Sequence, residues 1–270
     1  MGKIVWLASY PKSGNTWVRA FLHNYIVNAE TPHSINNLVD FSVAECAAAF
    51  YGADAASLTT EQVQALRPSV HKQLTQLQPD LVFVKTHNAH LSVHGIPLCT
   101  PAFTAGSLFM VRDPRDVALS YAAFTRRSVD EIIDFMNDTR ASNAPDENQV
   151  FEHLSSWSQH AISWVASPQR LLVRYEDLLA EPERYFARII RFIGMGEVDA
   201  VRLQRAIAFS SFDRLAGQEK AEGYRAAGRA EKFFRAGAAG QWRAHLTPAQ
   251  ARRLESAHGE VMQKFGYALS

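Results

Sequence analysis

Two periodicities alternate along the chain, and they predict two kinds of element. Residues 3–8, 81–85, 107–111 and 170–174 are apolar apart from their ends, which is typical of strands buried on both faces of a parallel sheet. Helically spaced apolar residues follow the first run: Val18, Phe21, Leu22, Tyr25 and Ile26 share one face. Because strand patterns alternate with helix patterns, we expect an α/β fold with a central parallel β-sheet flanked by helices.

Helix start and stop signals support this interpretation. Asp113 and Pro114 form an N-cap and first-turn pair after the third run, and Thr247 with Pro248 and Gln250 opens the last helix. Apolar spacing predicts a long helix over 150–164 and another over 182–193 that stops at Gly194. We expect one domain over residues 1–270.

Two stretches interrupt the alternation. Residues 30–80 have little β signal, and we expect a helical insertion over the sheet. Residues 217–240 combine several glycines with Arg225, Lys232 and Arg235, which predicts a mobile basic loop.

Composition narrows the class of partner. Twenty-eight Lys and Arg against 27 Asp and Glu leave a net charge of +1, so the chain encodes no global attraction to nucleic acid or to an anionic membrane. Any anion site must therefore be local. Cys46 and Cys99 lack CxxC spacing and are expected to be buried, reduced thiols. No run is long enough to span a bilayer, and we expect a cytoplasmic protein.

The segment YPKSGNTW, residues 10–17, is the most informative one. It lies between a predicted buried strand and the start of an amphipathic helix, where free N–H groups and the helix dipole favour an anion. Gly14 lets the backbone approach closely, and Lys12 adds a full charge. The simpler alternative is an ordinary turn with a surface lysine. It is not a Walker A loop, because Lys12 and Ser13 precede the glycine instead of following it.

The reversed order resembles the 5′-phosphosulfate loop of the cytosolic-type sulfotransferases that use 3′-phosphoadenosine 5′-phosphosulfate (PAPS). Further segments agree with this family in the same order along the chain: KTH at 85–87, VRDPRDVALSY at 111–121, RYEDL at 174–178, SSF at 210–212 and FRAGAAGQW at 234–242. The resemblance covers residues 3–245 and implies a P-loop-NTPase-like sulfotransferase fold. It also implies transfer of a sulfuryl group from PAPS to a hydroxyl or amine of a small-molecule acceptor.

The resemblance assigns catalytic roles to four residues. Lys12 stabilises the leaving phosphate, His87 is the general base, Lys85 contacts the transferring group, and Ser120 supports the donor. A lone histidine among ten is more often a packing residue, but His87 follows a predicted strand at the edge where open α/β sheets bind ligands.

The remaining residues that match the family are expected to bind the nucleotide. The resemblance implies that the loop at 10–17 binds the 5′-phosphate and that Arg112, Ser120 and the late segment, residues 234–242, bind the 3′-phosphate. The aromatic residues are expected to bind adenine. The alternative role for Arg112 is an ion pair with Asp116. The complete binding set is Lys12, Ser13, Gly14, Asn15, Thr16, Trp17, Arg112, Ser120, Tyr175, Ser210, Phe212, Arg235, Ala236 and Gly237. Ala236 departs from the family, which commonly has lysine there.

Other functions compete with this hypothesis. An ATP-dependent small-molecule kinase would need a carboxylate at a strand end to hold magnesium, where this chain has Lys85 and Arg112. A silent nucleotide-binding module would not need both Lys12 and His87. His87, His90 and His94 have loose metal spacing, but no metal is expected. The aromatic residues Phe41, Phe50, Tyr51, Phe103 and Phe124 favour a phenol, alcohol or lipid-like acceptor, and the oligomeric state is open.

Overall fold

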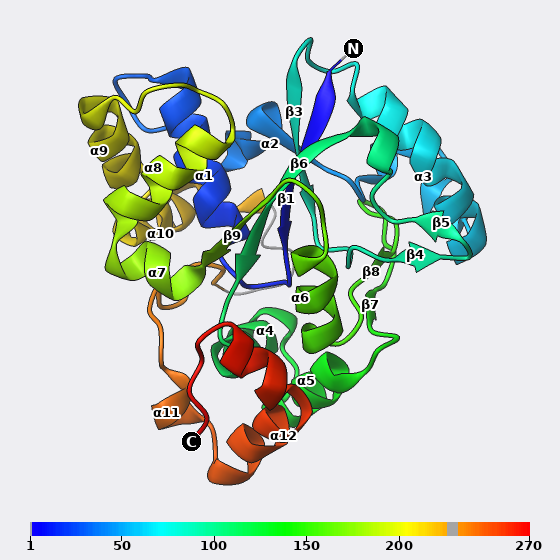
Figure 1. The fold of residues 1–270 in the computed structure, drawn as a ribbon, viewed down its shortest axis with the longest axis vertical. Helices are drawn as coiled ribbons and strands as arrows, with labels where there is room; N and C mark the ends of the chain where they lie inside the picture. Colours follow the sequence, from blue (N-terminus) through cyan, green and yellow to red (C-terminus); the bar gives the residue numbers. More distant parts are fainter. Residues whose placement is uncertain (1, 226–231) are drawn as a thin grey trace.

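Five parallel strands form the central sheet of the computed structural model, which describes residues 2–225 and 232–270 (Figure 1). Their order is β2-β3-β1-β6-β9. The bounds are β1 (Lys3–Ser9), β2 (Ser42–Ala44), β3 (Leu81–Thr86), β6 (Thr104–Val111) and β9 (Arg170–Arg174). The four strands predicted from apolar runs are therefore confirmed, and β1 lies at the centre between β3 and β6.

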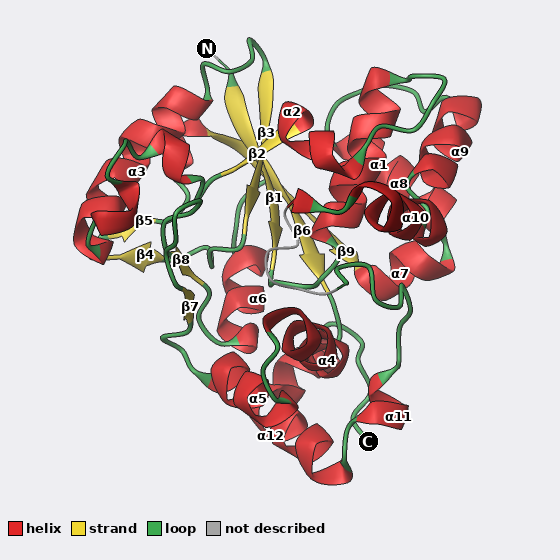
Figure 2. Cartoon of the chain, turned by 180° about the vertical axis from the view of Figure 1, so that it is seen from behind, coloured by secondary structure: helices red, strands yellow, loops and turns green. Residues whose placement is uncertain are grey.

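Alternate residues of β1 point to opposite faces of the sheet, and each face is covered by helices. Ile4, Trp6 and Ala8 join the larger apolar cluster, whereas Leu7 joins the second. The larger cluster packs under α3 (Thr60–Leu74), α4 (Pro114–Thr125), α5 (Val129–Asn137), α6 (Trp157–Val165) and α12 (Pro248–Lys264). The second packs under α1 (Asn15–Val27), α7 (Tyr175–Ala180), α8 (Pro182–Phe192) and α9 (Ala200–Phe209). Figure 2 shows the two groups of helices on either side of the strands.

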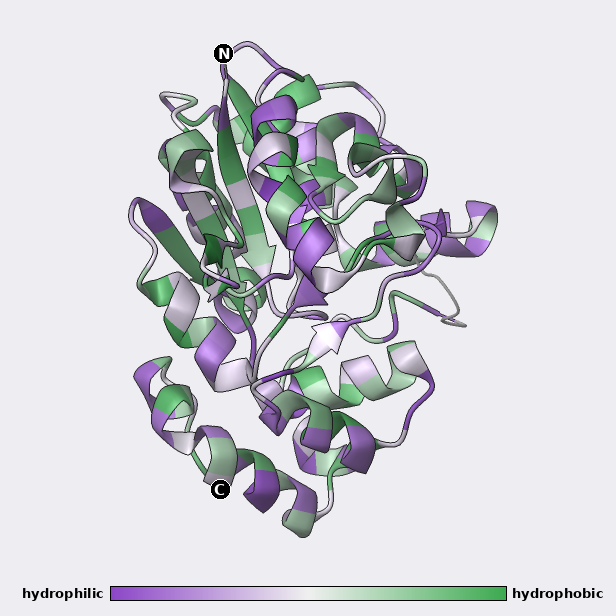
Figure 3. Cartoon of the chain, turned by 90° about the vertical axis from the view of Figure 1, so that its right-hand side faces the viewer, coloured by the Kyte–Doolittle hydropathy of each residue, from purple (hydrophilic) through white to green (hydrophobic). Residues whose placement is uncertain are grey.

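The remaining elements lie in the connections. The helices are α2 (Leu38–Phe41), α10 (Phe212–Glu222) and α11 (Trp242–His245), and the 3₁₀ turns are Ile35–Asn37, Ala48–Phe50, Ala55–Ser57 and Pro101–Phe103. Two short antiparallel strand pairs are β4 (Ser92–Val93) with β5 (Ile96–Pro97) and β7 (Ser142–Asn143) with β8 (Glu152–His153). Colouring by hydropathy shows predominantly apolar strands and polar residues on the outer helix faces (Figure 3). No helix in the described part of the chain is long and apolar enough to cross a membrane.

The local capping signals are confirmed. The Asp113 side chain accepts the Arg115 N–H at the start of α4, and Thr247 and Gln250 form a reciprocal capping box at the start of α12. Cys46 and Cys99 are free and buried.

Three expectations need correction. The helix predicted over 150–164 begins only at Trp157, because β8 precedes it and Ser155 has a left-handed φ of 60°. The insertion at 30–80 is not wholly helical, since β2 pairs with β3 and extends the sheet. The loop predicted at 217–240 starts later, because α10 continues to Glu222; residues 226–231 of it lie outside the described part.

Candidate active site

Four strands end at one edge of the sheet, and each is followed by a residue singled out by the sequence. Lys12 lies in the loop after β1, His87 directly follows β3, Arg112 follows β6 and Tyr175 follows β9. Because all strands are parallel, these residues gather at the carboxyl edge, where open α/β sheets bind ligands. We call Lys12, Arg112, Tyr175, Phe212 and Gly237 the donor cluster. We call Lys85, His87 and Glu152 the base cluster.

The loop after β1 has a fixed backbone, and the N–H groups at the start of α1 are free to bind a ligand. Gly14, the N-cap of α1, has a φ of 99°, and a Cβ there would lie 2.8 Å from Cδ2 of Tyr175, so only glycine fits. Asn15 ties the loop down by donating from Nδ2 to the Leu7 carbonyl at 2.8 Å and to Ser9 Oγ at 3.3 Å. No side chain among the described residues caps α1, so its first N–H groups can receive an anion. Thr16 and Trp17, in the first turn, are half-buried.

Lys12 is a half-buried cation held by aromatic rings. Its φ is 65°, and its Nζ lies 3.7 Å from the ring centroid of Phe233 and 4.3 Å from that of Phe124. Burial, together with the charges of Arg112 and Arg235, lowers the pKa of Lys12 from 10.5 to about 7, and Glu219 only partly opposes this. An anion placed beside Lys12 would restore the charged form.

Arg112 connects the loop after β1 to the late segment of the chain, residues 234–242. Its Nη1 donates to the Lys12 carbonyl at 3.1 Å, its Nη2 donates to the Ala238 carbonyl at 3.0 Å, and its guanidinium lies 4.3 Å from the Tyr175 ring centroid. The alternative ion pair with Asp116 is not formed in the described structure. Asp116 instead accepts the N–H groups of Gly240 and Trp242, which holds the late segment against α4.

Unsatisfied buried polar atoms test whether the donor cluster fits an anionic ligand. Among the described residues, Ser13 Oγ and Arg112 Nε are buried and have no hydrogen-bond partner. A buried donor without a partner costs about 1–3 kcal/mol, which a bound anion at these two atoms would recover. Both belong to the predicted phosphate-binding set, and the residues present therefore fit the expected nucleotide.

Aromatic residues border the same region. The Trp17 and Tyr175 rings meet edge to face with centroids 5.6 Å apart. Gly237 has a φ of 61°, and a Cβ there would lie 2.3 Å from Cδ2 of Phe212, so the late segment packs directly on that ring. These contacts bring the predicted adenine-side residues into the donor cluster.

Other predicted residues are placed less clearly for binding. The Ser210 hydroxyl is buried and donates to the Ala206 carbonyl at 2.8 Å, so it is used within α9. Arg235 is exposed and donates to Gln241 Oε1 at 2.8 Å, and Ala236 is half-buried beside it. Ser120 lies half-buried on α4. Their roles toward the donor stay predictions.

His87 is oriented so that one ring nitrogen is a free base. Its Nδ1 lies 2.7 Å from the Ser9 carbonyl, which only accepts, so Nδ1 carries the proton and Nε2 keeps its lone pair. The His87 carbonyl accepts from His160 Nε2 at 3.1 Å. Burial and the Lys85 charge lower the pKa of His87 to about 4, and Glu152 opposes that shift. The imidazole is therefore neutral at physiological pH.

Sequence reasoning missed three features of this region. Glu152 accepts the His87 backbone N–H at 2.8 Å, and Phe124 and Phe233 enclose Lys12. The available signal for Glu152 was a carboxylate, next to His153, between the apolar residues Phe151 and Leu154. No cluster of three or more metal-binding side chains occurs among the residues that the structure describes, and His87, His90 and His94 do not form one.

Comparison with known proteins assigns the family. The model of the family described as "Sulfotransferase domain" matches residues 3–266, nearly the whole chain. The chain belongs to this family. It is a sulfotransferase, and the kinase alternative is not favoured.

Relatives and solved structures agree with this assignment. The dog protein named sulfotransferase 1B1 is 26% identical over 270 residues, covering 95% of this chain and 82% of its own. Flavonol 3-sulfotransferase of Flaveria bidentis is 23% identical and covers 98% of this chain and 83% of its own. The structure of retinol dehydratase in a complex with retinol and PAP has a TM-score of 0.65 at 19% identity, covering 96% of this chain and 81% of that one. The predicted α/β sulfotransferase fold is confirmed.

Proposed function

We propose that this sulfotransferase moves a sulfuryl group from PAPS to a hydroxyl of a small-molecule acceptor, with His87 as the general base and Lys12 at the leaving phosphate. The observation that carries the proposal is that both residues lie at one sheet edge, with His87 Nε2 unprotonated and the half-buried Lys12 in the loop before the uncapped start of α1. A binding module would need no such base.

His87 acts on the acceptor. Its Nε2 takes the proton of the acceptor hydroxyl, while the electron pair of that oxygen forms the new bond to sulfur and the bond from sulfur to the donor phosphate breaks. The Ser9 carbonyl holds the ring orientation throughout, because Nδ1–H keeps donating to it. Proton transfer to a base positioned in this way commonly contributes about 10²–10⁴-fold in rate.

Lys12 and Lys85 act on the negative charge. Bound PAPS supplies the sulfuryl group and a phosphate leaving group. The Lys12 ammonium neutralises the charge that grows on this phosphate, and the amides of Ser13 to Thr16 hold it. Lys85 lies on β3, two residues before His87, and we assign it to the transferring group. We assign Ser120 to the support of the donor.

Arg112 and the aromatic residues bind the rest of the nucleotide. The free Nε of Arg112 suits the 3′-phosphate, and Arg235 with Ala236 and Gly237 approaches from the late segment. Trp17, Tyr175 and Phe212 offer aromatic surface for adenine, with Ser210 beside them.

The acceptor is a small apolar molecule with a hydroxyl group. Solved relatives are described in complexes with retinol or androsterone, and one curated relative is named for a flavonol. Phe124, half-buried beside Lys12, supplies an apolar surface for a phenol, alcohol or lipid-like acceptor. Two relatives from Arabidopsis thaliana are named cytosolic sulfotransferases, and reduced Cys46 and Cys99 suit the same compartment.

Thermal-shift measurements test the donor assignment. We expect 3′-phosphoadenosine 5′-phosphate (PAP) without magnesium to raise Tm strongly, because a ligand at 100 times its Kd adds about 2.7 kcal/mol of stability. ATP with magnesium serves as the comparison ligand and should have little effect. The reverse result, stabilisation by ATP with magnesium and none by PAP, would contradict the proposal.

A further inference from the structure

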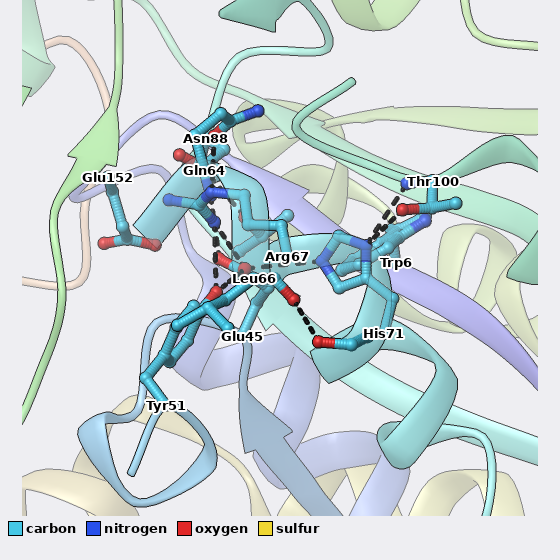
Figure 4. A network of polar contacts seen from close by, with 12 residues as sticks. Trp6, Glu45, Tyr51, Gln64, Leu66, Arg67, His71, Asn88, Thr100 and Glu152 are labelled. Carbon is cyan, nitrogen blue, oxygen red and sulfur yellow. Dashed lines mark hydrogen bonds and ion pairs between the residues drawn. The ribbon is translucent and has the colours of Figure 1, made fainter. Parts of the chain in front are cut away.

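The chain segment that carries the base is held by two buried carboxylates from distant elements. Glu152 of β8 accepts the His87 N–H at 2.8 Å, and Glu45, which follows β2, accepts from Asn88 Nδ2 at 2.8 Å. Both glutamates have 0% exposure. Figure 4 shows Asn88 and Glu45 with their neighbours, and Glu152 close by. His87 and Asn88 are thus fixed from two sides.

The two carboxylates have different surroundings. Glu45 pairs with Arg67 and also binds Tyr51 at 2.5 Å and His71 at 3.3 Å, so its charge is fully matched by other side chains. Glu152 is matched only in part. Its Oε2 accepts from Asn143 Nδ2 at 3.1 Å and lies 3.9 Å from Lys85 Nζ, which is itself 18% exposed. The remaining charge of Glu152 therefore acts on the base cluster.

Glu152 stays ionised in this setting. Burial alone would raise its pKa, but Lys85, His87, the His87 N–H and Asn143 together lower it. The charge opposes the effect of burial and Lys85, which lower the pKa of His87. Other groups facing His87 are Arg19 of α1 and His160 of α6. A fixed carboxylate favours the imidazolium that forms when His87 takes a proton.

We propose that Glu152 is a positioning residue of this enzyme: it fixes the His87 backbone and offsets the Lys85 charge, so that His87 can accept the acceptor proton. This rests on the proposed role of His87. Asn143 supports the arrangement in turn, because its Oδ1 accepts from the Tyr121 hydroxyl at 2.8 Å.

Substitution of Glu152 separates its charge from its hydrogen bond. Glu152→Gln keeps an oxygen that can accept the His87 N–H but removes the charge, whereas Glu152→Asp keeps the charge. We expect Glu152→Gln to lower kcat about 10–100-fold with 2-naphthol as acceptor, while the Kd for PAP stays within twofold of the parent value. Glu152→Asp should recover part of the lost kcat. Glu147→Gln, an exposed change in the same connection, is the matched control and should change neither quantity.

A second readout distinguishes a role in proton transfer from a purely structural one. With 4-nitrophenol, which ionises near neutral pH and needs little base, the loss in Glu152→Gln should be smaller than with 2-naphthol. An equal loss with both acceptors, or a loss confined to PAP affinity, would overturn the inference.

His87→Ala, measured in parallel, separates this inference from the proposed function. If His87→Ala abolishes transfer while Glu152→Gln keeps the parent kcat, only the inference about Glu152 is wrong. If His87→Ala transfers at the parent rate, the proposed base itself is wrong.

Discussion

Lys12 is a half-buried charge and Glu45 a fully buried one, and the contrast between their partners distinguishes a binding site from a structural support. Glu45 is surrounded by Arg67, His71, Tyr51 and Asn88. Burial alone would raise its pKa, but Arg67, His71 and Tyr51 lower it to about 2. Lys12 has two aromatic rings within about 4 Å, and among the described residues it forms no ion pair; its pKa falls to about 7.

The difference between the partners of Lys12 and Glu45 reflects different roles of the two charges. A satisfied buried pair stabilises one arrangement of the chain, and removing one partner is costly. A buried cation in contact with aromatic faces gains only about 2 kcal/mol from them, which does not replace an anion. We interpret Lys12 as a charge whose partner arrives with the ligand, and Glu45 as one whose partners belong to the fold.

The sharpest way to break this comparison is to remove the Lys12 charge. Lys12→Met keeps the apolar stem between Phe124 and Phe233 but deletes the ammonium, so we expect kcat to fall by about 10³-fold. PAP should still bind, with Kd raised less than about 10-fold, because the amides and Arg112 remain. Steady-state kinetics and calorimetry measure the two quantities. Lys72→Met, an exposed change on α3, is the control; a parent-like kcat in Lys12→Met would remove Lys12 from its role.

Removing a partner of Glu45 should instead lower the stability of the protein. Arg67→Met leaves Glu45 as an uncompensated buried charge and also breaks the 2.7 Å bond to the Phe151 carbonyl, so unfolding free energy should fall by about 3 kcal/mol or more. For a chain of this size Tm then falls by about 6–12 °C.

The control for this prediction is Arg127→Met. It breaks an i,i+4 pair with Glu131 whose partners are 42% and 55% exposed, and such pairs contribute about 0–1 kcal/mol. Equal Tm losses in Arg67→Met and Arg127→Met would show that burial does not determine how much these ion pairs contribute to stability.

The two regions also differ in how far the sequence predicts them. Lys12, His87, Arg112 and Tyr175 each follow a strand, so a local pattern together with the parallel sheet is enough to gather them at one edge. Gly14 and Gly237 were predicted to bind the nucleotide, and their close approach to aromatic rings explains why glycine is needed.

The support of the base could not be predicted in the same way. Glu152 and His87 are 65 residues apart, and their bond depends on where β8 packs, which no local period encodes. The helix pattern over 150–164 even favoured the wrong element, since a left-handed Ser155 ends the extended segment before Ser156 caps α6. β2 was missed because three residues are too few to show a period of two.

A final test of the comparison is the pH dependence of stability that Lys12 contributes. Between pH 7 and 10.5 the unfolded chain keeps the Lys12 proton, whereas the folded chain, with a pKa of about 7, has released it. Stability rises with pH wherever the unfolded state binds more protons, so Lys12 contributes a rise across this window. Below pH 7 both states are protonated, and the folded state carries the full cost of holding the Lys12 charge in this site.

Lys12→Met should therefore be more stable than the parent protein at pH 7, and the difference in Tm should shrink as pH approaches 10. Lys72→Met, a change at an exposed lysine, is the matched control. A difference that stays constant or widens for Lys12→Met would mean that the ammonium is already paired in the ligand-free protein. The same measurements with saturating PAP extend the comparison. PAP supplies the anion that Lys12 lacks, so Lys12→Met should no longer have a higher Tm than the parent protein at pH 7. The Tm loss in Arg67→Met should persist.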